Sequence, residues 1–213
     1  MWDWIQRGGP VMYPLLLCSV VSMAFIIERF LFWAIDMRGS DSDEADKMLD
    51  FLRQGKTKEF LKASQSTKNP ICLTLTRALS HGEETLTESL SLEIDATVEK
   101  TLRSLNVMDT CVTLAPLLGI FGTVTGIIQA FDILGTTAMA DPHAASIGIA
   151  QALITTAAGL MIAMPSLIFF NYFTSKSEHF TYRLEKYARE FDILYKRAHD
   201  NLKGTGSSQA RLK

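Results

Sequence analysis

Three long stretches without charge alternate with charge-rich stretches along this chain of 213 residues. The uncharged stretches begin near Val11, Thr110 and Ala144, and each is long enough to cross a bilayer as a helix, which takes roughly 20 apolar residues. In the charge-rich stretches, apolar residues recur every three or four positions, which is typical of helices with one exposed face. The pattern predicts an all-α, polytopic membrane protein with three transmembrane helices.

Charges, glycines and prolines set the expected boundaries. We expect an N-terminal interfacial amphipathic helix (1–10), a first span (11–35), a cytoplasmic helical segment (36–104), a second span (105–134), a short periplasmic turn (135–143), a third span (144–173), a cytoplasmic helix (174–203) and a disordered tail (204–213). The helices of the second and third spans are thus expected to extend into the cytoplasm. Within 36–104, capping and stop signals predict four helices, and Thr85-x-x-Glu88 fits a capping box for the fourth. No breaker follows before Asp109, so this helix is expected to run directly into the second span.

The distribution of Lys and Arg predicts the orientation. These residues are frequent in 36–103 and after 175, whereas the N-terminal flank holds only Arg7 and the turn at 135–143 holds none. The positive-inside rule therefore places the large segment and the C-terminus in the cytoplasm, and the N-terminus on the periplasmic side. A net charge of -2 gives no indication of a nucleic-acid partner.

Small residues form a stripe on each of the last two spans. On the second span the stripe comprises Ala115, Gly119, Gly122, Gly126 and Ala130, and on the third Ala145, Ala152, Thr156, Gly159 and Ala163. Small residues let helices approach closely in lipid, where no hydrophobic drive brings them together. We interpret the second span as a wall of an oligomeric assembly.

A threonine stands on each stripe at a similar expected depth. Thr123 lies nine residues before Asp132, and Thr156 lies about as far from the start of the third span. In several assembled copies these hydroxyls would form a narrow polar ring, to which Gln151 and Thr155 add polar atoms. The alternative is that each threonine bonds the carbonyl four residues earlier and the stripes only pack helices.

Ionisable residues are absent from the central part of every span. Thr and Gln cannot take up and release protons near neutral pH, so a proton-carrying carboxylate must come from another polypeptide. Glu28 and Arg29 lie together near the end of the first span, as an interfacial stop signal or as half of an intersubunit salt bridge. No metal cluster, disulfide framework or phosphate-binding loop is predicted, so we expect no enzyme activity and no cofactor.

Two segments carry a family resemblance. APLLGIFGTVTGIIQAF (Ala115–Phe131) and GIAQALITTAAGLMIAMPSLIFFNYF (Gly148–Phe173) resemble the signature helices of the MotA/TolQ/ExbB proton-channel family, and the three spans resemble its ExbB and TolQ members. The resemblance implies a pentamer in the bacterial inner membrane, around the helices of an ExbD- or TolR-like partner whose membrane aspartate carries the proton. Proton flow would then drive TonB-dependent transport, a Tol-Pal function or gliding.

The resemblance also implies residue roles. Thr123 and Thr156 match the pore threonines, whereas Gln151 stands where many members have a glutamate. The positions implied to pack helices are Pro116, Gly119, Gly122, Gly126, Gly159 and Pro165, to which the stripes add Ala115 and Ala163. The rival hypothesis is an oligomeric membrane scaffold that conducts nothing.

Overall fold

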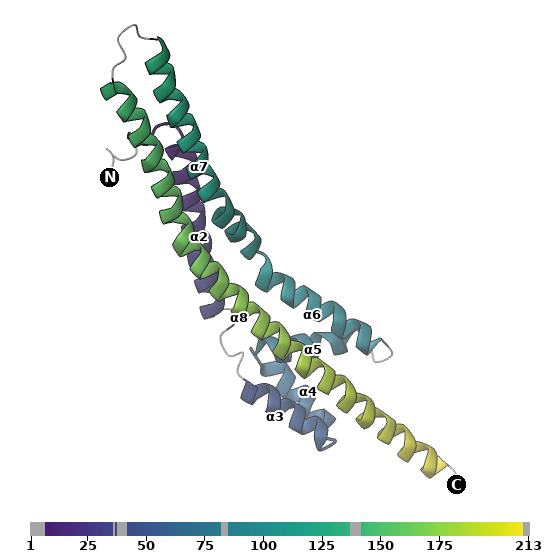
Figure 1. Cartoon of the computed structure of the whole chain (residues 1–213). Coiled ribbons are helices and arrows are strands. Elements are labelled where there is room, and N and C mark those ends of the chain that lie inside the picture. Colours follow the sequence, from purple (N-terminus) through teal and green to yellow (C-terminus); the bar gives the residue numbers. More distant parts are fainter. Residues whose placement is uncertain (1–6, 36, 38–41, 82–84, 137–141, 211–213) are drawn as a thin grey trace. The chain divides into compact units, whose positions relative to one another are not determined.

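The computed structural model describes residues 7–35, 37, 42–81, 85–136 and 142–210, and these residues are helical with no β-strand. The helices are α2 (Met12–Ile35), α3 (Ser42–Arg53), α4 (Thr57–Ser66), α5 (Pro70–Ser80), α6 (Leu86–Leu102), α7 (Leu105–Thr136) and α8 (Pro142–Ala210) (Figure 1). The predicted all-α class is therefore confirmed. Most of the predicted interfacial helix and of the predicted turn at 135–143 lies outside the described residues.

Three of the described helical stretches are long and apolar enough to cross a membrane, and they contain α2, α7 and α8. Each exposes large apolar side chains, for example Leu17 on α2, Phe121 on α7 and Ile168 on α8. A surface of this kind suits contact with lipid or with further helices. The chain is therefore a multi-pass membrane protein, as its hydrophobic pattern predicted.

The chain divides into two compact units. Met1–Phe30 and Ser104–Thr174 form the first unit, which contains most of α2, all of α7 from Leu105 and the first half of α8. Leu31–Arg103 and Ser175–Lys213 form the second, which contains α3 to α6 and the second half of α8. The candidate membrane spans thus belong largely to the first unit.

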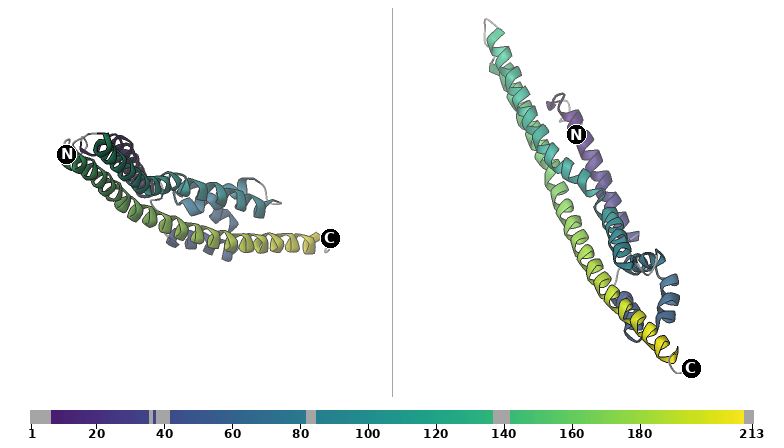
Figure 2. Two further views of the ribbon diagram at one scale, coloured as in Figure 1. Left: turned by 45° about the horizontal axis from the view of Figure 1, so that its top comes forward. Right: turned by 90° about the vertical axis from the view of Figure 1, so that its right-hand side faces the viewer.

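In the first unit, α2, α7 and α8 share a small core. Val11, Met12 and Leu15 at the start of α2 cluster with Ala115 of α7 and Ala163 of α8, and α7 and α8 run side by side in every view (Figure 2). The small Ala115 and Ala163 leave room for the larger side chains at the start of α2 to pack against α7 and α8.

A buried pair of serines also joins α2 to α8. The Oγ atoms of Ser22 and Ser166 lie 2.6 Å apart, and Ser166 Oγ donates to the Ile162 carbonyl at 2.7 Å. The single hydroxyl proton of Ser166 is then used within α8, so Ser22 is the donor across the helices. A buried hydroxyl is costly without a partner, and each serine satisfies the other.

In the second unit, α3, α4, α5 and α6 pack against one another. Asn69 caps α5 as its sequence predicted, because its side chain accepts from the Ile71 amide at 2.9 Å. The three- and four-residue recurrence of apolar positions gives this half of α8 one buried face, which includes Phe180, Leu184, Tyr187 and Phe191. Phe191 contacts Phe60 of α4 with ring centroids 5.5 Å apart.

Three local expectations were wrong. Thr85 precedes α6 but forms no side-chain cap bond, so the capping box is not made. The helix ladder is interrupted at Arg103 and Ser104, and the Thr101 carbonyl near this break accepts from the Ser177 hydroxyl at 3.4 Å; an inserted side chain is a known cause of such breaks. At the C-terminus, α8 continues to Ala210, through most of the tail predicted to be disordered.

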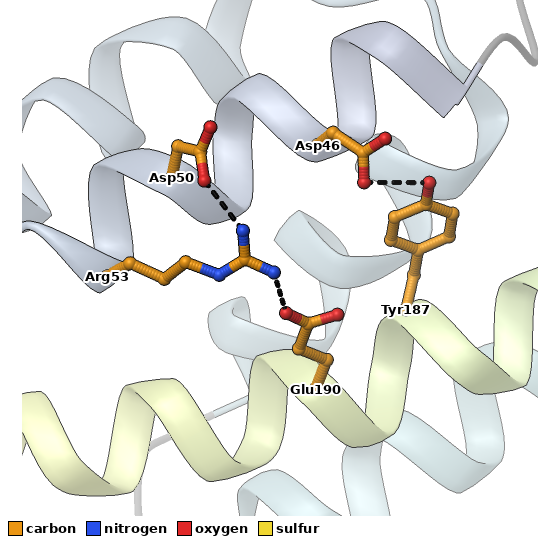
Figure 3. A network of polar contacts seen from close by, with 5 residues as sticks. All are labelled: Asp46, Asp50, Arg53, Tyr187 and Glu190. Atoms are coloured by element: carbon orange, nitrogen blue, oxygen red, sulfur yellow. Dashed lines mark hydrogen bonds and ion pairs between the residues drawn. The ribbon is translucent and has the colours of Figure 1, made fainter.

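A polar network fastens α3 to α8 in the second unit (Figure 3). Tyr187 donates to Asp46 at 2.9 Å, and Arg53 bridges Asp50 at 2.8 Å and Glu190 of α8. The Arg53 side chain is half exposed, so its ion pairs contribute little. Tyr187 is buried, and burial, followed by the bond to Asp46, raises the pKa of Tyr187 to about 12.

Tyr187→Phe should lower the free energy of unfolding by about 1 kcal/mol, because it removes this bond and leaves Asp46 without it. The raised pKa of Tyr187 means that folding favours the neutral phenol. Tyr187 therefore contributes fully to the free energy of unfolding below pH 10, the ordinary pKa of a tyrosine. This contribution is lost as the pH rises to about 12, the pKa in the folded state. The measurement is thermal unfolding in detergent from pH 8 to 11. The control is Tyr182→Phe, at a side chain that is 70% exposed on the same helix. It should change neither the free energy of unfolding nor its dependence on pH. Equal behaviour of the two variants would contradict this role.

Candidate functional site

The two predicted stripes of small residues meet each other within one chain. A Cβ atom added at Gly159 of α8 would lie 2.5 Å from the Ala115 carbonyl oxygen of α7, and one at Gly119 would lie 3.1 Å from Thr156 Cα. Further along, a Cβ at Gly126 would lie 2.9 Å from the Gly148 carbonyl oxygen. The backbones of α7 and α8 are therefore in direct contact, which only glycine or alanine permits.

This contact gives the predicted packing residues different outcomes. Ala115 and Ala163 are buried, and Pro116 is half-buried within α7. Pro165 is exposed on α8 in the single chain, so its packing role stays a prediction for the assembled protein. Gly148 was missed, although it stands four residues before Ala152 and its Cβ position lies 3.0 Å from Ala130.

The threonine pair lies at the centre of this contact. Thr123 Oγ1 and Thr156 Oγ1 are 2.6 Å apart, and each lies 3.0 Å from the Gly119 carbonyl oxygen. The two hydroxyls therefore lie at the same level along the paired helices, and their depth in a membrane stays a prediction. Thr123 also makes the bond to the carbonyl four residues earlier that the alternative interpretation predicted, while Thr156 reaches the same oxygen from the other helix.

Proton counting shows what this pair can offer. Two hydroxyls hold two protons, so when one hydroxyl donates to the other, only the second can donate to Gly119. The chain can run from Thr123 through Thr156 to the carbonyl, or in the opposite sense. In either case both protons are used, whereas each oxygen keeps an acceptor lone pair. An approaching group that leaves the pair intact must therefore be a hydrogen-bond donor.

Thr155, predicted beside the proton path, is instead buried between the two helices. Its Oγ1 donates to the Ala152 carbonyl at 2.8 Å, and a Cβ added at Gly122 would lie 2.6 Å from Thr155 Cβ. The side chain is 1% exposed. Within this chain it fills the space at Gly122, and its place beside the proton path stays a prediction.

Gln151 does not join the threonine pair. Its carboxamide lies against Gly9, in the turn that precedes α2, where an added Cβ would be 2.8 Å from Gln151 Cδ. The sequence placed this amide on the proton path, and nothing in the local pattern pointed to residue 9, which is 142 positions away in the chain.

Glu28 and Arg29 form an ion pair within the chain. Arg29 Nε lies 2.9 Å from Glu28 Oε2, and a second bond joins Arg29 to Glu28 Oε1. Arg29 is buried whereas the Glu28 carboxylate is about half exposed. Among the described residues, no three Cys, His, Asp or Glu side chains could share a metal ion.

The part of the chain that carries the threonine pair also shows which family the chain belongs to. The model of the MotA/TolQ/ExbB proton channel family matches residues 53–186, which include α6, α7 and the threonine pair. The chain belongs to this family. Its all-helical structure and its three apolar helical stretches suit a transport protein of the ExbB and TolQ kind.

Relatives within the MotA/TolQ/ExbB family support the assignment. An ExbB-like biopolymer transport protein of Synechocystis is 32% identical over 201 residues, covering 92% of this chain and 95% of its own. The TolQ protein of the Tol-Pal system from Pseudomonas aeruginosa is 37% identical over 117 residues, covering 54% of this chain and 51% of its own. The ExbB protein of Aquifex aeolicus is 38% identical over 82 residues, covering 38% of this chain and 55% of its own.

Gly159→Ala should destabilise the α7–α8 contact by about 1–3 kcal/mol, because its Cβ would meet the backbone of Ala115. The control is Gly135→Ala near the end of α7, whose added Cβ meets nothing within 4 Å. Alanine favours a helix over glycine by roughly 1 kcal/mol at both positions, so the difference between the variants isolates the clash. Thermal unfolding in detergent is the measurement. Equal stabilities would show that the backbones are not in contact at Gly159.

Proposed function

We propose that this chain is the ExbB/TolQ-like subunit of an inner-membrane proton channel that, with an ExbD/TolR-like partner, couples the proton-motive force to work across the envelope. The observation that carries the proposal is the hydroxyl pair of Thr123 and Thr156, held 2.6 Å apart inside a candidate membrane span. Membership of the proton-channel family supports the same conclusion.

The hydroxyl pair favours one protonation state of a carboxyl group on the partner's helix. A protonated carboxyl group on the partner's helix can donate to either threonine oxygen without breaking a bond of the pair. A carboxylate can only accept, so it would have to draw a hydroxyl proton away from Gly119. The pair therefore favours the neutral acid, and the proton is carried by the partner's carboxyl, because the central parts of the spans contain no ionisable residue of their own.

The assembly proposed around this pair is a homopentamer with the partner's helices at its centre. The large exposed apolar side chains of α2, α7 and α8 would be covered by lipid and by neighbouring copies. The N-terminus would be periplasmic and the C-terminus cytoplasmic, as the Lys and Arg distribution favours. TonB-dependent transport is the proposed use of the work, and Tol-Pal function or gliding are alternatives.

A non-conducting scaffold is the second candidate. It is favoured by the contact of both stripes within a single chain and by the closeness of both threonine hydroxyls to the Gly119 carbonyl, which packing alone would explain. The two candidates differ in one respect: a scaffold uses the hydroxyls only for helix packing, whereas a channel also uses them to bind the proton carrier.

Thr123→Val with Thr156→Val separates the two candidates. A channel should assemble and lose proton flux by about tenfold or more, since each lost hydrogen bond to the carrier is worth about 1 kcal/mol and 1.4 kcal/mol is tenfold. Flux is measured with a pH-sensitive dye trapped in vesicles that contain the chain and its partner. Thr113→Val is the control, because this exposed threonine on α7 bonds its own helix at Asp109.

Replacing the partner's membrane aspartate by asparagine completes the test. Flux should stop although the complex still forms, because the carrier of the proton has been removed. Undiminished flux in that complex would contradict the proposed mechanism. Normal flux in the double valine variant would contradict the role of the hydroxyl pair, whereas a parent complex that assembles but passes no protons would favour the scaffold.

A further inference from the structure

The turn before α2 lies directly on α8. Gly9 adopts φ +71°, in the region that favours glycine, and its carbonyl accepts from the Met12 amide at 3.1 Å to begin the helix. The side chain of Gln151 occupies the space next to its Cα: an added Cβ would lie 2.8 Å from Cδ and 3.5 Å from Cγ. Gly9 is therefore excluded from carrying a side chain for two independent reasons.

The same turn positions a core. Val11 and Met12, immediately after Gly9 and Pro10, are buried against Ala115 and Ala163. Any movement of Gly9 away from α8 would shift these side chains, because only Pro10 and Val11 separate Gly9 from Met12. The carboxamide of Gln151 thus lies under the point at which α2 joins the other two helices.

We propose that Gln151 is a positioning residue that sets the turn before α2 against α8 and takes no part in proton transfer. The amide carries no charge at any working pH, so it can rest on the backbone of Gly9 without the cost of burying an ionised group. Thr156 of α8 meets Gly119 of α7, whereas Gln151 of α8 meets Gly9, so these two polar side chains contact different neighbours. The statement about proton transfer rests on the proposed function, and the statement about the turn does not.

A double-mutant cycle tests the contact in the full-length protein. Gly9→Ala should lower the unfolding temperature by about 5 °C, through the clash and the backbone strain together. In the Gln151→Ala background the same change should cost clearly less, because the clashing atoms are gone while the strain remains. Equal shifts in both backgrounds would overturn the contact. The control cycle combines Gly135→Ala of α7 with Asn171→Ala, which removes an exposed amide on α8, the helix that carries Gln151. These two changes should show no coupling to each other.

The pH profile of proton flux tests the second half of the proposal. Gln151→Ala, co-reconstituted with the single-span partner and normalised to the assembled complex, should keep the profile of the parent chain. A displaced profile at unchanged assembly would overturn it, because a residue that only positions the turn cannot change which group titrates. If the parent complex itself passes no protons, the proposed function fails, and the unfolding temperatures still decide the role of Gln151.

Discussion

The rest of the first unit depends on the direct contact of two peptide backbones inside a candidate membrane region. Lipid offers no hydrophobic drive for helices to associate, so α7 and α8 must gain their attraction from van der Waals contact at short range. Gly119, Gly126 and Gly159 make that range possible, since a single methyl group at each would collide with or crowd the opposite helix. The hydroxyl site is a product of the same closeness: Thr156 reaches a carbonyl of the other helix because Gly119 places no side chain between them.

In this contact one threonine hydroxyl has both a packing role and a place in the candidate site. A bond to the threonine's own helix and a contact with a functional partner are not exclusive. Thr123 Oγ1 lies within hydrogen-bond distance of both the Gly119 carbonyl of its own helix and the Thr156 hydroxyl. The intrahelical bond fixes the rotamer, and the fixed rotamer aims the oxygen at the second hydroxyl. A local packing bond can therefore be part of the functional geometry.

Local signals made much of the fold predictable. Uninterrupted apolar runs predicted α2, α7 and α8, the Asn69–Pro70 pair predicted the start of α5, and counting residues from Asp132 predicted the depth of Thr123. What failed depended on residues distant in the chain. A stripe shows that something approaches closely but not what: within one chain the stripe of α7 meets α8, and its role in an oligomer stays a prediction. The break after Arg103 coincides with a bond from Ser177, and the placement of Gln151 depends on Gly9; neither has a signature in nearby sequence.

Every atom of the hydroxyl pair and of the carbonyl it shares comes from one chain. A closed ring of such chains would repeat a finished polar unit and would not have to create one at the seam between neighbours. Subunit number is then free to change in evolution without dismantling the chemistry, because altering the stoichiometry removes no bond from the pair. The number of subunits would then be set by the contacts between the outer faces of the helices in neighbouring chains and by the diameter of the helices inside the ring.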